Sequence, residues 1–83
     1  MAIIFHPHAL QRMDERGVTR AEVRRTLEIG QKCPARFGRR KYEMSFSYRD
    51  IWRSKFYEHK HLEVYCVDEE KDTLVITVVV KYF

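Results

Sequence analysis

Residues 7–30 read PHALQRMDERGVTRAEVRRTLEIG, and this stretch carries the start and stop signals of two helices. Thr19 and Glu22 form a capping box, in which the hydroxyl and the carboxylate each accept a backbone N–H at the start of a helix. Pro7 suits the first turn of an earlier helix, and Gly17 is a typical helix end. The stretch therefore predicts a helical hairpin made of two segments, residues 7–16 and 20–29.

After this hairpin the apolar period changes from 3.6 residues to 2. Apolar and polar residues alternate over residues 42–49, which predicts a half-buried strand. A further strand region spans residues 56–68, and the run 74–80 is apolar on both faces, as in an interior strand. We expect an α+β two-layer sandwich, with the two N-terminal helices on one face of a three- or four-stranded antiparallel sheet. Residues 1–83 form one domain.

Length and composition exclude several classes of protein. The 83 residues are 45% hydrophobic and 34% charged, which is typical of a soluble globular chain. No apolar run approaches the ~20 residues that span a bilayer, and the first residues do not resemble a signal peptide. Two cysteines provide no disulfide framework. We expect a cytoplasmic protein with no membrane partner and no cofactor.

The formal net charge of +4 is concentrated in the centre of the chain. The stretch Arg36 to Lys41 also contains Arg39 and Arg40, and such a patch suits a polyanion such as RNA. Lys55 adds a cation among the tyrosines of the predicted sheet, an arrangement that can bind a single strand. The alternative is a solvated loop that keeps the protein soluble.

A polar stripe follows the first predicted helix. His8, Arg12 and Arg16 are four residues apart, so they share one helix face. An imidazole can transfer a proton near neutral pH, and guanidinium groups bind phosphate through paired N–H bonds. The stripe suits chemistry on a phosphodiester, although surface helices often carry such residues without a function.

Two His-x-His pairs, at residues 6–8 and 59–61, raise the alternative of a zinc site. Zinc needs three or four ligands at ~2.0–2.3 Å, and nothing in the spacing enforces that convergence. We therefore predict no metal site, with a zinc-binding domain as the lesser possibility.

The sequence HALQRMDERGV at residues 8–18, the Thr-capped helix after it, and the later stretches 57–64 and 74–78 resemble a widespread bacterial domain family of unknown function. That family is regarded as a distant relative of the RelE- and BrnT-like ribonuclease toxins, with helices packed on an antiparallel sheet. The resemblance implies a metal-independent ribonuclease or a toxin-like module, with an antitoxin protein as its partner. Its motif positions correspond to His8, Arg12, Arg16, Lys60 and Thr77.

The first hypothesis is RNA cleavage by attack of the ribose 2′-OH on the adjacent phosphate. His8 transfers the proton, and the cations Arg12, Arg16 and Lys60 hold the phosphate. Thr77 orients the phosphate or His8 by a hydrogen bond. The second proton-transfer residue is open, with Tyr82 and Lys60 as candidates. The alternative hypothesis is a non-catalytic module that binds RNA or an antitoxin-like protein partner.

Overall fold

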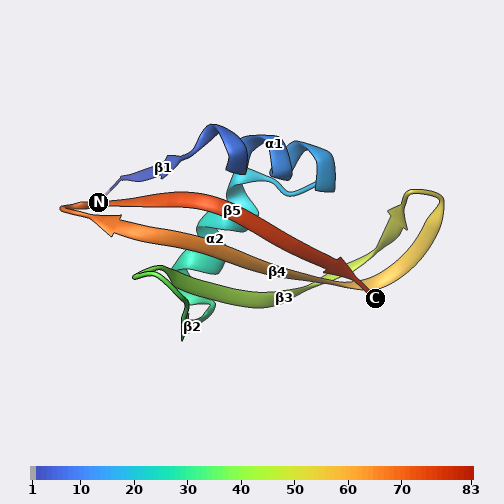
Figure 1. Ribbon diagram of the computed structural model, residues 1–83. Coiled ribbons are helices and arrows are strands. Elements are labelled where there is room, and N and C mark those ends of the chain that lie inside the picture. The colour runs from blue at the N-terminus through green and yellow to red at the C-terminus, as the bar shows by residue number, and fades with distance from the viewer. Residues whose placement is uncertain (1) are drawn as a thin grey trace.

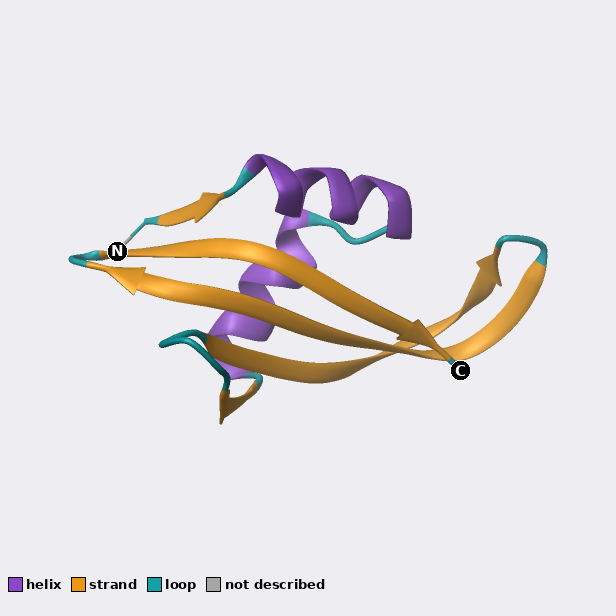
Figure 2. Ribbon diagram, in the orientation of Figure 1, coloured by secondary structure: helices purple, strands orange, loops and turns teal. Residues whose placement is uncertain are grey.

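Two helices lie on one face of a five-stranded sheet in the computed structural model, which describes residues 2–83 (Figures 1 and 2). The elements in chain order are β1 (Ile3–Phe5), α1 (Pro7–Arg16), α2 (Arg20–Ile29), β2 (Gln31–Pro34), β3 (Arg40–Trp52), β4 (Lys55–Glu69) and β5 (Asp72–Tyr82). The strand order across the sheet is β1-β5-β4-β3-β2. The two predicted helices are confirmed, and the apolar run at residues 74–80 lies in an interior strand as expected.

The predicted three- or four-stranded antiparallel sheet is wrong. The sheet is mixed, because β1 pairs with β5 in parallel while the other neighbours are antiparallel. β1 is only three residues long, too short to show an alternating pattern. β2 carries Pro34 and no apolar alternation, and an edge strand tolerates a residue that lacks an N–H donor.

β3 is also longer than the strand predicted at residues 42–49, because it begins at Arg40 and continues through Trp52. The register with β4 shifts between Ser47 and Asp50, and Arg49 has a positive φ of 47°. A bulge of this kind interrupts the alternation of side chains without ending the strand. The β3–β4 hairpin consequently projects well beyond the helices (Figure 1).

The helix ends follow from local hydrogen bonds. Nδ1 of His6 accepts a bond of 3.0 Å from the backbone N–H of His8, which caps the start of α1. The capping box of α2 is complete: the N–H of Thr19 donates to Glu22 Oε1 at 2.9 Å, and the N–H of Glu22 donates to Thr19 Oγ1 at 3.1 Å. No helix within residues 2–83 is long and apolar enough to cross a membrane.

The core lies between the helices and one face of the sheet. α1 packs mainly on β5, and α2 packs on β3 and β4. Buried residues of the helical hairpin meet buried strand residues there. They are Ala9 and Met13 on α1, Val18 in the connection between the helices and Val23 on α2, and Leu62, Val64, Val75 and Val78 on the strands. Because side chains alternate along a strand, the residues between the buried ones project from the other side. We call that side, opposite the helices, the open face.

Lys60 is the buried cation that joins the helices to the sheet. Its side chain is 3% exposed, and its Nζ donates to the Gly17 carbonyl at 2.6 Å and to Glu22 Oε1 at 2.9 Å. The rings of Tyr48 and Tyr82 lie 5.7 and 5.5 Å from the ammonium, within the range of a cation–π contact. One side chain from β4 therefore binds the end of α1 and the first turn of α2.

Replacing Lys60 by methionine tests this role. The Lys60→Met variant should lose about 2–4 kcal/mol of unfolding free energy, because the Gly17 carbonyl and the Glu22 carboxylate lose their charged donor. Urea denaturation of Lys60→Met and of the matched control Lys55→Met measures the effect, since Lys55 is exposed at the start of the same strand. Equal midpoints for the two variants would contradict the assigned role.

Gly17 and Gly38 provide a matched pair for the contact at the end of α1. Both have φ of +71°, which costs an L-residue roughly 1–2 kcal/mol. A Cβ at Gly17 would also lie 2.5 Å from Trp52 Cζ3, whereas a Cβ at Gly38 meets nothing within 4 Å. Gly17→Ala should therefore destabilise the protein by at least about 1 kcal/mol more than Gly38→Ala in thermal or urea unfolding. A smaller loss for Gly17→Ala would show that Trp52 does not pack against this turn.

Candidate functional site on the open face of the sheet

Six polar side chains of β3 and β4 gather on the open face. They form three directly opposed cross-strand pairs: Lys41 with Tyr65, Glu43 with Glu63, and Ser45 with His61. The residues between them on β4, such as Leu62 and Val64, are fully buried against the helices. We call these six residues the open-face cluster.

His61 is held by neighbours on both sides of its ring. Its Nδ1 lies 2.8 Å from Ser45 Oγ, at hydrogen-bond distance, and its Nε2 lies 3.8 Å from Glu43 Oε2. The contact with Ser45 fixes the orientation of the imidazole. The side chain is 26% exposed, so Nε2 is positioned beside a carboxylate and within reach of a ligand.

Lys41 lies between the two carboxylates of the cluster. Its Nζ is 3.5 Å from Glu43 Oε2 and 3.8 Å from Glu63 Oε1. Desolvation opposes the charge of Lys41, but Glu43 and Glu63 outweigh it and raise the pKa of the ammonium. Burial raises the pKa of Tyr65, as does the hydrogen bond of 2.9 Å that its hydroxyl donates to Glu63. Both groups therefore keep their protons at neutral pH.

The pairing of Glu43 with Glu63 is unfavourable for folding alone, because like charges directly opposed on adjacent strands repel each other. The ammonium of Lys41 offsets part of that repulsion. Residues that break a local stability rule in this way are typical of functional sites. A carboxylate pair, an oriented imidazole and a cation are the groups needed for acid–base chemistry on a phosphate ester.

A basic pocket adjoins the cluster at the turn between β2 and β3. Its volume is about 370 Å³, and it is lined by Pro34, Ala35, Arg36, Phe37, Arg39, Lys41 and Tyr65. Lys41 and Tyr65 belong to both the pocket and the cluster, so the two are continuous. No acidic side chain lines this pocket among the residues that the structure describes.

The structure divides the predicted nucleic-acid-binding residues. Arg36, Arg39 and Lys41 line the basic pocket together. Arg40 instead forms an ion pair of 2.9 Å with Asp68. Lys55 lies in the β3–β4 hairpin, at the opposite end of β3, with its Nζ 5.3 Å from the centre of the Tyr57 ring.

The five residues implied by the family resemblance do not converge. His8 and Arg12 lie on α1, where His8 is exposed and Arg12 pairs with Glu15 at 3.6 Å. Lys60 is buried on the helix-facing side of the sheet, at the far end of α1 from His8. Thr77 opposes Tyr65 in the pairing of β4 with β5 and is thus beside the open-face cluster.

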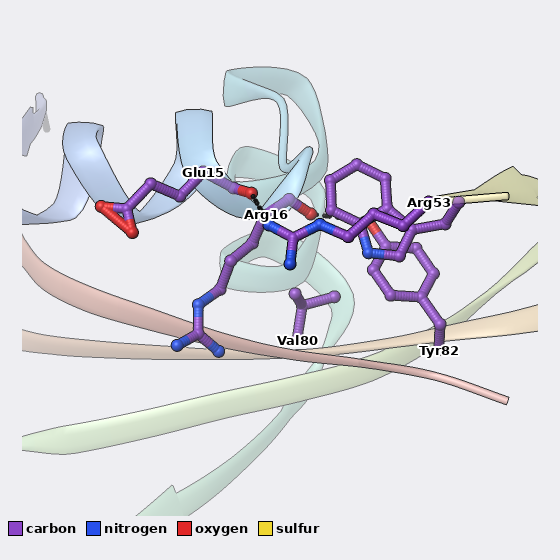
Figure 3. A pocket seen from close by; sticks show the side chains of 6 residues that line it. Glu15, Arg16, Arg53, Val80 and Tyr82 are labelled. Atoms are coloured by element: carbon purple, nitrogen blue, oxygen red, sulfur yellow. Dashed lines mark hydrogen bonds between the residues drawn. The ribbon is translucent and has the colours of Figure 1, made fainter.

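Arg16, the fifth of these residues, lines a cleft of about 360 Å³ at the end of α1 (Figure 3). Arg53 donates to the Glu15 carbonyl at 3.0 Å there, and Tyr82 donates to the Arg16 carbonyl at 2.7 Å. Burial is the main cause that raises the pKa of Tyr82 to about 12, so its phenol remains protonated near neutral pH. Arg53 and Tyr82 therefore close the end of α1 against the sheet, and the Tyr82 hydroxyl is already bonded to the Arg16 carbonyl there.

Sequence reasoning missed most of the open-face cluster as a site. The signal was present, because polar residues occupy alternate positions at 41, 43 and 45 and again at 61, 63 and 65. The sequence does not show the register of β3 with β4, which places these two runs of residues opposite each other. His61 was considered only as a metal ligand beside His59.

A metal ion is the other ligand that the cluster could hold. Ligand atoms of Glu43, His61 and Glu63 lie within 4.8 Å of one another, and this is the one such group among residues 2–83. The ammonium of Lys41 is already beside both carboxylates, so a dication would have to displace it. The arrangement therefore favours chemistry that uses the side chains themselves.

A comparison with protein-family models matches residues 5–80 to a domain of unknown function, DUF4258. The chain belongs to the DUF4258 family. Comparisons with curated proteins and with solved structures give no significant match. Membership of DUF4258 assigns no activity. The residues of the open face are therefore the basis for proposing a function for this DUF4258 domain.

Proposed function

We propose that this DUF4258 domain is a metal-independent endoribonuclease whose reaction takes place at the open-face cluster. The observation that carries the proposal is one shared carboxylate oxygen. Glu43 Oε2 lies 3.8 Å from His61 Nε2 and 3.5 Å from Lys41 Nζ. A carboxylate, an imidazole and an ammonium are thus within reach of a single phosphate group.

The proposed reaction needs one base and one acid. A carboxylate of the Glu43–Glu63 pair takes the proton of the ribose 2′-OH, and the 2′-oxygen attacks the adjacent phosphorus. The bond from phosphorus to the 5′-oxygen breaks, and protonated His61 gives that leaving oxygen its proton. Lys41 stabilises the negative charge that develops on the phosphoryl oxygens. The products are a 2′,3′-cyclic phosphate and a 5′-hydroxyl.

The surroundings of the cluster favour RNA as the substrate. The basic pocket supplies Arg36 and Arg39 for the phosphates on one side of the cut. The nucleophile is a 2′-hydroxyl, which DNA lacks. Thr77 pairs with Tyr65 across β4 and β5, and in this proposal it contacts the same RNA strand.

The wider biological role follows the same proposal. A RelE- or BrnT-like toxin would have this reaction class, and an antitoxin protein would block it by covering the open face. The relation to those toxins and the existence of such a partner stay predictions. We infer a cytoplasmic location, since RNA is available there and both Cys33 and Cys66 are free thiols.

Cleavage of a fluorescently labelled single-stranded RNA in EDTA tests the proposal. The wild-type protein should cut the RNA and leave 2′,3′-cyclic phosphate ends, and His61→Ala should lose at least ~10²-fold in rate. Glu43→Gln and Glu63→Gln should each reduce the rate, and the substitution with the larger loss identifies the base.

His8→Ala and His59→Ala are the matched controls. Both histidines are exposed and lie outside the open-face cluster, so both variants should cleave at the wild-type rate. Loss of activity in His8→Ala with none in His61→Ala would move the reaction to the stripe on α1. If the wild-type protein binds RNA but does not cleave it, the ribonuclease proposal fails and the protein is a non-catalytic RNA-binding module.

A further inference from the structure

Phe37 is exposed to an extent that folding does not explain. Its exposed fraction is 89%, the largest of the exposed large hydrophobic residues in the described chain. Its φ is +61°, in the left-handed region that a residue with a bulky side chain rarely adopts. Within residues 2–83, Phe37 does not belong to the core, and its ring makes no ring pair or cation–π contact.

The arginines on either side are also unused by the fold. Arg36 and Arg39 are exposed, and neither side chain makes a hydrogen bond or an ion pair within residues 2–83. Their one mutual contact is the backbone bond from the Arg39 N–H to the Arg36 carbonyl, at 3.2 Å. One turn therefore carries the Phe37 ring and the guanidinium groups of Arg36 and Arg39. Its backbone is strained at Phe37, and none of the three side chains has a structural partner in the described chain.

The turn adjoins the open-face cluster. Phe37, Arg36 and Arg39 line the basic pocket together with Lys41 and Tyr65, which also belong to the cluster. A flexible strand that crosses the cluster would pass over this ring. Aromatic faces stack on nucleobases, while guanidinium groups bind the phosphates next to them.

We propose that Phe37 is the stacking platform for an unpaired base, with Arg36 and Arg39 binding the flanking phosphates, so that the substrate is single-stranded RNA. The inference deepens the proposed function and rests on it for the place of the cut. A base within a duplex has both faces covered by its neighbours, so the ring can stack only on a base that is free. The absence of acidic side chains from the described lining of the pocket agrees with a polyanion as the occupant.

Binding measured without cleavage tests the platform. Fluorescence anisotropy of His61→Ala with a labelled single-stranded 12-nucleotide RNA gives the reference affinity. Adding Phe37→Ala should weaken binding by roughly 5- to 100-fold, the range for loss of one base–aromatic stack, and Phe37→Trp should restore it. Phe56→Ala is the matched control. Phe56 is 55% exposed in β4, where it pairs with Ile51 near the end of β3 that is far from Phe37, so its loss should leave binding unchanged.

The same titration separates stacking from phosphate binding. Replacing Arg36 and Arg39 together by alanine should reduce the slope of log affinity against log salt by about 0.7 for each phosphate that the variant no longer neutralises. A duplex of the same RNA with its complement should bind more weakly than the single strand, and Phe37→Ala should not change the affinity for the duplex. Equal affinities of Phe37→Ala and Phe56→Ala for the single strand, or tighter binding of the duplex, would overturn the platform.

The outcomes distinguish the platform from the ribonuclease. If single-stranded RNA binds in a Phe37-dependent way but the wild-type protein does not cut it, the platform stands and the ribonuclease proposal fails. If the wild-type protein cuts RNA through His61 while Phe37→Ala binds and cuts as the control does, the ribonuclease stands and the platform fails.

Discussion

Lys60 connects both helices to the sheet, and the orientation of the other β4 side chains depends on this contact. The ammonium donates to the end of α1 through Gly17 and to the first turn of α2 through Glu22. Since Lys60 must face the helices to do this, the alternation along β4 turns His61 and Glu63 to the other side. A shift of the strand by one residue would bury the imidazole and expose the lysine.

The two faces of the sheet consequently carry different kinds of side chains. The helix-facing side holds the apolar core and the bonds that close the end of α1, including those from Tyr82 and Arg53. The open face instead holds two opposed carboxylates, which lower stability, and the lysine between them removes only part of that cost. Stability is thus concentrated on one face, and groups suited to chemistry on the other.

The helices could be predicted from the sequence because their determinants are local. Thr19 and Glu22 are three residues apart, and Gly17 ends α1 by its own conformation. The mixed sheet could not, because the parallel pairing of β1 with β5 joins Ile3 to Thr73 and leaves no short-range pattern. The bulge after Ser47 similarly concealed the last three residues of β3, 50–52.

The site was harder to predict for the same reason. Lys60 matched a motif position for phosphate binding, but its partner Glu22 is 38 residues away, so its burial as an ion pair was not visible. His61 and Glu43 meet only through the register of β3 with β4. Basic residues near position 40 could be identified by composition, although the division between the pocket and the Arg40–Asp68 ion pair required the fold.

Nuclear magnetic resonance of the wild-type protein with a single-stranded RNA whose 2′-hydroxyls are methylated tests whether the open face binds RNA, because the methylated strand has no free hydroxyl to attack the phosphate and cannot be cut. We predict that the largest chemical-shift changes fall on Phe37, Lys41, His61 and Tyr65, with little change along α1. Changes concentrated at His8 and Arg12 instead would contradict the assignment of the open face as the RNA-binding surface.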